Sequence, residues 1–209
     1  MHNQLTKPIL FCDFNGVISY NYFWHELSDS NHKLHQYYSQ VRDLYTPQMA
    51  IDWMKGNYTT EQINLIISRQ LSISYQDLLD SFIEGCRNID ISKPILGTIN
   101  RLKAQYTCVL ITDNMDSFDR FTLPSNPILQ ETFDYISNSY NAKLLKIDNN
   151  GQILMDICSR FNSDIKQCIL IDDSPKNCNL FNNIGGNSVC VSGETKVVDS
   201  LLGIMLRIN

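Results

Sequence analysis

Short apolar runs that end in polar residues recur along the chain and predict buried strands. The clearest runs occupy residues 8–12, 108–111 and 168–171, and weaker ones lie at 133–136 and 188–191. Near-continuous apolar character, without alternation, is typical of strands that are covered on both faces of a parallel sheet. These runs therefore predict the strands of a buried parallel sheet.

From residue 20 to about residue 87 the apolar positions follow helical spacing instead. Thr59 and Gln62 have the spacing of a capping box, and the helix that follows is expected to have one apolar face. A second helix is expected to begin after Ser74, whose side chain can cap it. This stretch predicts an all-helical unit.

After Lys93, helical patterns alternate with the strand runs, and Ser174-Pro175 marks the start of one of these helices. Alternating strands and helices predict an α/β fold with a doubly wound parallel sheet. We expect residues 1–19 and 89–209 to form this α/β core domain. Residues 20–88 would be a helical subdomain inserted after the first strand, with hinges near 16–20 and 88–93.

Charge and cysteine content narrow the functional classes. The net charge is −5 and no run of Lys or Arg occurs, so nucleic acid and anionic membranes are not expected partners. Neither a membrane span nor an N-terminal signal peptide is expected. Seven scattered cysteines without a CxxC pair indicate buried thiols in a reducing compartment, which points to the cytoplasm. His32 and His35 lack thiolate or carboxylate companions, so a surface pair is expected there rather than a metal site.

Polar residues follow three of the predicted strands at the edge where parallel sheets bind ligands. They are Asp13, Thr112 and the pair Asp172-Asp173. Carboxylates from two strands suit Mg²⁺, and a Thr hydroxyl at a strand-to-helix junction suits a phosphate oxygen. A lysine, either Lys143 or Lys146, could complete a site for a phosphoryl group.

These motifs resemble those of the haloacid dehalogenase (HAD) superfamily of hydrolases. Residues 13–17 (Asp-Phe-Asn-Gly-Val) resemble its first motif, residues 110–114 its second and residues 169–177 its fourth. Lys146 resembles the third-motif lysine better than Lys143 does. The four motifs occur in order over nearly the whole chain. The resemblance implies a HAD-like Rossmannoid core, with the helical subdomain as a cap that sets substrate choice.

The resemblance also implies a role for each motif residue. Asp13 would be the nucleophile that forms an aspartyl-phosphate, and also a Mg²⁺ ligand. The backbone carbonyl of Asn15 and the carboxylate of Asp173 would be further metal ligands, with Asp172 bound directly or through water. The phosphate-binding residues would be Thr112, Asp113 and Lys146.

Asn15 departs from the pattern, because phosphatases of the family have an Asp there as general acid/base. An amide cannot exchange a proton in this way, and such catalysis is typically worth roughly 10²–10⁴-fold. Four explanations compete: an acyl phosphate substrate that needs no acid, a slow phosphatase, a non-hydrolysing relative, or a substitution introduced to trap a complex. A dehalogenase is disfavoured, since family dehalogenases work without Mg²⁺ and have a different fourth motif.

We interpret the sequence as a Mg²⁺-dependent phosphatase that acts on a small phosphorylated metabolite, with activity weakened by Asn15. The alternative is a catalytically silent HAD-fold protein that binds a phosphorylated ligand or partner. Retention of Asp13 favours the enzyme. Tyr22 and Phe23 are candidates for the substrate pocket, whereas core packing is expected for Trp24.

Overall fold

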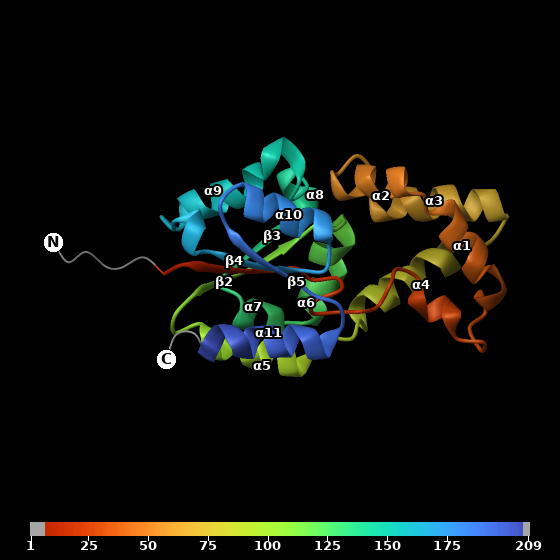
Figure 1. The fold of residues 1–209 in the computed structure, drawn as a ribbon. Coiled ribbons are helices and arrows are strands. Elements are labelled where there is room, and N and C mark those ends of the chain that lie inside the picture. Colours follow the sequence, from red (N-terminus) through yellow and green to blue (C-terminus); the bar gives the residue numbers. More distant parts are fainter. Residues whose placement is uncertain (1–6, 207–209) are drawn as a thin grey trace.

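A five-stranded parallel sheet forms the centre of the computed structural model, which describes residues 7–206 (Figure 1). Its strand order is β3-β2-β1-β4-β5. The central strand β1 (Ile9–Cys12) pairs with β2 (Thr107–Thr112) and β4 (Ile169–Asp172), and the edges are β3 (Tyr135–Asn138) and β5 (Asn187–Cys190). The chain runs outward from β1 in both directions, so the doubly wound arrangement predicted from the sequence is confirmed.

Both faces of the sheet are buried under helices (Figure 1). Leu10 and Cys12 of β1 face an apolar cluster with α5 (Lys93–Leu102) and α11 (Glu194–Leu206), while Ile9 and Phe11 face the opposite cluster. That opposite cluster includes residues of α9 and α10. These helices are α9 (Gln152–Arg160) and α10 (Pro175–Asn183). Burial on both faces explains why the strands have continuous apolar runs.

The region between β1 and β2 is helical and has its own apolar cluster. Trp24, Trp53 and Phe82 pack together at its centre. The predicted insertion of helices after the first strand is thus confirmed, while the boundaries 19/20 and 88/89 stay a prediction. Its elements are two 3₁₀ turns (His25–Ser28 and His35–Tyr37) and the helices α1 (Tyr38–Leu44), α2 (Pro47–Met54), α3 (Thr60–Leu71) and α4 (Tyr75–Arg87).

Capping residues mark the starts of α3, α4 and α10, as the sequence predicts. Thr59 accepts a hydrogen bond from the backbone N–H of Gln62, whose side chain accepts one from Thr59 N–H, so the capping box is complete. Ser74 and Ser174 cap α4 and α10, where each side chain accepts a hydrogen bond from the backbone N–H three residues later. Each such cap is typically worth about 1 kcal/mol.

The segment between β2 and β4 differs from the sequence prediction. The strand expected at 133–136 lies at Tyr135–Asn138, because the Asp134 carboxylate accepts a hydrogen bond from Cys108 N–H before the ladder to β2 begins. Several short elements in this segment were not predicted. They are a π-helical turn (Phe118–Thr122), the helices α6 (Leu123–Ser125), α7 (Ile128–Thr132) and α8 (Ser139–Ala142), and two 3₁₀ turns (Asp148–Asn150 and Ile165–Gln167).

The thiols and the helix lengths bear on two expectations from the sequence. All seven cysteines are free thiols, and Cys190 alone among them is exposed. Within residues 7–206, no helix has the length and apolar character needed to cross a membrane.

Candidate active site

Three carboxylates meet where the chain leaves β1 and β4. Asp13 follows β1, and its backbone N–H donates to the carbonyl of Ile171 on β4 (2.9 Å). Asp172 ends β4 and Asp173 follows it. Because the connections after these neighbouring strands diverge, this edge is the crevice where open α/β sheets bind ligands. One oxygen from each carboxylate lies within 4.8 Å of the others, which is close enough for one cation to contact all three.

The two aspartates of the β4 pair have different surroundings. Asp172 is fully buried and accepts hydrogen bonds from the backbone N–H of Ser174 (2.9 Å) and from the Asn177 amide (3.1 Å). Asp173 is exposed, and its carboxylate accepts no side-chain hydrogen bond from the described residues. Gly16 (φ +77°) passes so close that a β-carbon there would overlap the Asp173 carboxylate. Asp173 is thus the member of the pair with free oxygens.

Lys146 is the lysine at these carboxylates. Its side chain is 1% exposed, and its Nζ lies 2.8 Å from Asp13 Oδ2 and 2.7 Å from Asp172 Oδ2. Its backbone N–H donates to Asp113 Oδ1 (2.9 Å), which fixes the loop that carries it. Lys143 is exposed instead, with its ammonium 4.3 Å from the centre of the Tyr140 ring. Of the two lysines that the sequence left open, the structure therefore brings Lys146 to Asp13.

Acidic side chains outnumber the cation in this group. Burial raises the pKa of the Asp13 carboxyl to about 8, although the nearby Lys146 ammonium opposes this shift. Burial also lowers the pKa of Lys146, but Asp13, Asp172 and Asp113 outweigh it and raise that pKa above its ordinary value. Three carboxylates face one ammonium. A divalent cation with a preference for oxygen ligands, such as Mg²⁺, fits both the donor set and the charge.

Thr112 ends β2 beside this group. Its hydroxyl is buried and has no hydrogen-bond partner among the described residues. Buried polar groups are usually paired, so an orphaned hydroxyl next to a charged crevice needs an explanation. A bound anion, such as a phosphate oxygen, would satisfy it.

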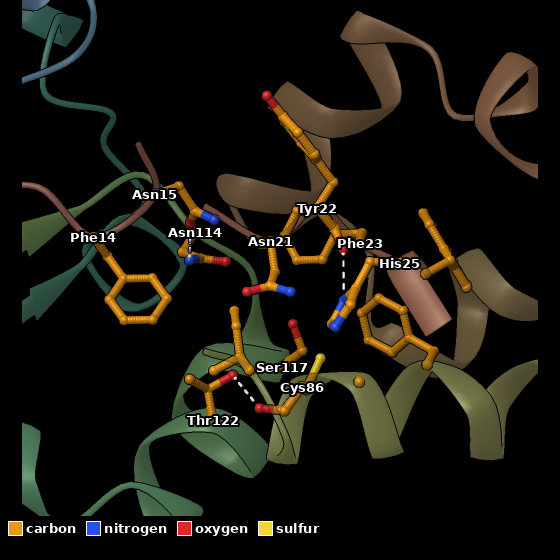
Figure 2. Close-up of a pocket in the computed structure, with 14 residues that line it drawn as sticks. Phe14, Asn15, Asn21, Tyr22, Phe23, His25, Cys86, Asn114, Ser117 and Thr122 are labelled. Carbon is orange, nitrogen blue, oxygen red and sulfur yellow. Dashed lines mark hydrogen bonds between the residues drawn. The ribbon is translucent and has the colours of Figure 1, made fainter. Parts of the chain in front are cut away.

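Asn15 lies between the carboxylates and the helical region. Its side-chain oxygen accepts a hydrogen bond from the Asn114 amide (3.0 Å), as Figure 2 shows. Asn114 is positioned in turn by Ser139, whose hydroxyl accepts from its backbone N–H (3.0 Å). The sequence alone indicates no role for Asn114 or Ser139. The position of Asn114 at the end of the second motif, residues 110–114, is the one signal that it gives.

A cleft of about 380 Å³ opens over Asp13, Asn15 and Asp173. Tyr22 and Phe23 line it, as expected for these two residues. Trp24 instead packs in the helical cluster and does not line this cleft. A smaller cavity of about 20 Å³ lies beyond Asn15 (Figure 2) and has room for a water molecule.

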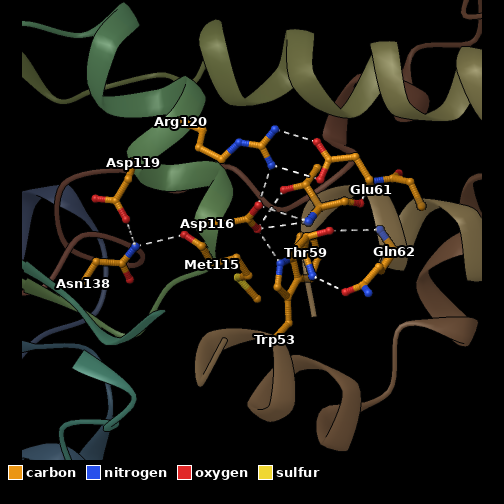
Figure 3. Close-up of polar contacts among 11 residues, drawn as sticks. Trp53, Thr59, Glu61, Gln62, Met115, Asp116, Asp119, Arg120 and Asn138 are labelled. Carbon is orange, nitrogen blue, oxygen red and sulfur yellow. Dashed lines mark hydrogen bonds and ion pairs between the residues drawn. The ribbon is translucent and has the colours of Figure 1, made fainter. Parts of the chain in front are cut away.

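A polar network around the buried Asp116 joins the helical region to the loop after β2 (Figure 3). Asp116 accepts hydrogen bonds from the Trp53 indole (2.7 Å) and from the Thr60 hydroxyl (2.9 Å). Arg120 pairs with Asp116 (2.7 Å) and also with Glu61 of α3 (2.6 Å). This network holds α2 and α3 against the segment that carries Asp113. The sequence gives no indication of the network.

Solved structures, rather than similar sequences, show which known proteins share this fold. No model of a protein family matches the sequence, and no curated protein matches it significantly. A solved structure of a predicted HAD-like family hydrolase from Porphyromonas gingivalis is similar, with 17% identity, a TM-score of 0.71, and coverage of 96% of this chain and 98% of that one. A HAD family enzyme from Bacteroides thetaiotaomicron, in complex with magnesium and inorganic phosphate, has a TM-score of 0.71 at 17% identity, over 90% of this chain and 96% of that one.

A 2-haloacid dehalogenase from Pseudomonas syringae pv. Tomato DC3000 also matches, with 11% identity and a TM-score of 0.63 over 97% of this chain and all of that one. The chain therefore has the fold of HAD-family hydrolases, with helices inserted after β1. The fold predicted from the four motifs is confirmed. At these identities the likeness concerns the fold alone.

Proposed function

We propose that this protein is a Mg²⁺-dependent phosphatase that hydrolyses a small phosphorylated metabolite through an aspartyl-phosphate on Asp13. One observation carries the proposal: a buried Asp13–Lys146–Asp172 group adjoins the free carboxylate of Asp173 at the crevice of the sheet. A nucleophile, a cation and a metal-binding carboxylate converging on one point are suited to phosphoryl transfer.

The metal would be held by the carboxylates of Asp13 and Asp173 and by the backbone carbonyl of Asn15. Asp172 would act through water, since its oxygens already accept hydrogen bonds from Lys146 and Asn177. Bound Mg²⁺ supplies positive charge that offsets the charge of the phosphate oxygens. The complex of the B. thetaiotaomicron enzyme with magnesium and phosphate supports this choice of metal.

The chain's own residues would perform the transfer in two steps. The Asp13 carboxylate attacks phosphorus, the bond from phosphorus to the leaving oxygen breaks, and the electron pair stays on that oxygen. Lys146 and the Thr112 hydroxyl hold the phosphoryl oxygens, and Asp113 fixes the Lys146 loop. A water molecule then attacks phosphorus of the aspartyl-phosphate, the bond from phosphorus to the Asp13 oxygen breaks, and the proton of the water passes to solvent, which releases phosphate and restores the Asp13 carboxylate.

The helical region, over residues 20–88, would act as the cap of this active site. It contributes Tyr22, Phe23 and Tyr45 to the cleft above Asp13. Closing such a cleft excludes water from the reacting centre and brings specificity contacts to the substrate. Hinges near residues 16–20 and 88–93 would allow the movement.

The test is turnover of acetyl phosphate and a panel of phosphate monoesters, with and without Mg²⁺. We expect phosphate release that requires Mg²⁺, and acid quenching should trap a phosphoryl group on Asp13 detectable by mass spectrometry. Asp13→Asn should abolish both. No release from any substrate, together with no labelled Asp13, would contradict the proposal.

A second candidate is a silent protein that binds a phosphorylated ligand, and Asn15 is the observation that favours it. The two candidates differ in the response to Asn15→Asp. A phosphatase should gain activity when an acid is restored beside Asp13. A silent protein should bind Mg²⁺ and phosphate and yet stay inert in both forms.

A further inference from the structure

The upper walls of the cleft are aromatic and apolar. No Lys, Arg or His is among the described residues that line this cleft, and its acidic side chains lie at the Asp13 end. The aromatic and thioether side chains of the walls are Tyr20, Tyr22, Phe23, Tyr45, Met54 and Met115, and the uncharged polar residues Ser19 and Asn21 also line the cleft.

This lining restricts the chemistry of the leaving group of the substrate. A second phosphate or a carboxylate there would lose its hydration without meeting a cation, which is costly. An aromatic ring, by contrast, can pack against the tyrosines and against the thioethers of Met54 and Met115. A cleft of about 380 Å³ suits a small ligand of this kind.

The residue two positions after Asp13 cannot supply a proton to the leaving oxygen. The side chain of Asn15 is an amide, which cannot give up a proton. His25, in the smaller cavity beyond Asn15, has one ring nitrogen hydrogen-bonded with the Tyr22 carbonyl (3.0 Å) and the other 3.0 Å from the Glu26 carboxylate. Burial raises the pKa of Tyr45 above its ordinary value, so its hydroxyl is a poor acid.

We propose that the substrate is a phosphate monoester of a small, uncharged phenol. This inference rests on the proposed phosphatase function and names its substrate class. A phenol ionises with a pKa of about 10, as the Tyr side chain does, whereas aliphatic alcohols are far weaker acids. The bond from phosphorus to the aryl oxygen can therefore break with the electron pair remaining on phenolate, which takes its proton from solvent after release.

Two hydroxyls could recognise a polar substituent on the ring. Ser19 Oγ is fully buried, Tyr45 OH is also buried, and neither has a hydrogen-bond partner among residues 7–206. Both residues line the cleft. An uncharged substituent such as a hydroxyl or a carbonyl would pair with them, which is the usual state of buried polar groups.

Three substrates separate ring binding from leaving-group strength: phenyl phosphate, benzyl phosphate and acetyl phosphate. Phenyl phosphate should exceed benzyl phosphate in kcat/KM by roughly 10²-fold or more, the usual worth of the missing acid. Acetyl phosphate, which needs no acid and has no ring, should be turned over with a higher KM than phenyl phosphate. Turnover of acetyl phosphate with no preference for phenyl over benzyl phosphate would overturn this inference alone. Inertness toward all three would instead overturn the proposed function.

One variant tests the dependence on leaving-group strength, and a second tests binding of the aromatic ring. Asn15→Asp should reduce the ratio of kcat/KM for phenyl phosphate to kcat/KM for benzyl phosphate by roughly 10²-fold, because the variant supplies the missing acid. Tyr22 is 74% exposed, so Tyr22→Ala should not disturb folding, and it should raise KM for phenyl phosphate more than KM for acetyl phosphate.

Leu202→Ala, an exposed apolar position on α11, is the matched control and should change neither KM. An unchanged ratio in Asn15→Asp, or an equal rise of both KM values in Tyr22→Ala, would overturn the assignment. A phosphotyrosyl peptide hydrolysed better than phenyl phosphate would contradict a small-molecule substrate.

Discussion

At the scale of single residues, the site depends on how a few charged groups are paired. Asp13, Thr112 and Asp172-Asp173 could be predicted from the sequence because each follows an apolar strand run. Asn114 and Ser139 could not, since their contacts with Asn15 and with each other join segments far apart in the chain. The choice of Lys146 over Lys143 needed the family resemblance, because both lie in one irregular loop without periodicity.

Lys146→Met should destabilise the metal-free protein by about 3–5 kcal/mol, the usual cost of leaving a buried charge unpaired. The variant leaves the carboxylates of Asp13 and Asp172 facing each other without the ammonium between them. Urea unfolding with a chelator present measures the change. Lys143→Met, which removes an exposed cation over Tyr140, should cost less than about 1 kcal/mol. Equal losses in the two variants would contradict the assigned burial.

Gly16→Ala should weaken Mg²⁺ binding, because the new β-carbon would displace the Asp173 carboxylate. The positive φ of Gly16 adds backbone strain to the same variant. Isothermal titration with Mg²⁺ measures the affinity. Gly97→Ala is the control, since a β-carbon in α5 meets nothing within 4 Å and should leave Mg²⁺ binding unchanged. Unaltered affinity in Gly16→Ala would show that Asp173 is not a ligand.

At the scale of helices and strands, local signals explain most of what the sequence could predict. The caps of α3, α4 and α10 and the apolar runs of β1, β2 and β4 depend on residues close in the chain. The π-helical turn at Phe118–Thr122 depends on tertiary contacts instead, since Phe118 packs on Phe14 and Thr122 donates to the Cys86 carbonyl. No short-range pattern indicates such contacts, so the sequence predicts no helix or strand for this segment.

Asp116→Ala should lower the free energy of unfolding by about 3–5 kcal/mol. It leaves Arg120 with only its outer partner and removes the buried acceptor of Trp53 and Thr60. Glu61→Gln breaks the outer pair of the same arginine, which is about 40% exposed, and should cost at most about 1 kcal/mol. Denaturant unfolding of both variants gives the comparison. A larger loss from Glu61→Gln would mean that the outer pair holds the helices in place.

At the scale of the whole molecule, the metal should stabilise the fold. A ligand that binds only the native state adds about 2.7 kcal/mol when present at 100 times its Kd. Mg²⁺ should therefore raise the melting temperature of the metal-free protein, and Asp173→Asn should remove most of this rise. Asp199→Asn, at an exposed position on α11, should keep it. A thermal shift that is the same in Asp173→Asn and in the unaltered protein would place the ion elsewhere.

The path of the chain into and out of the helical region has a consequence for the ancestry of such a fold. The backbone N–H of Ser92 donates to the carbonyl of Ile18 (3.0 Å), so the entry and exit segments touch. Deleting the residues between them and closing the gap with a short turn would leave the order of strands unaltered. The same deletion would leave Asp116 and Met115 facing solvent, since Trp53 and Thr60 now cover them. One insertion or deletion between Ile18 and Ser92 would thus add or remove the helices. The loop after β2 would then need other residues in place of Met115 and Asp116.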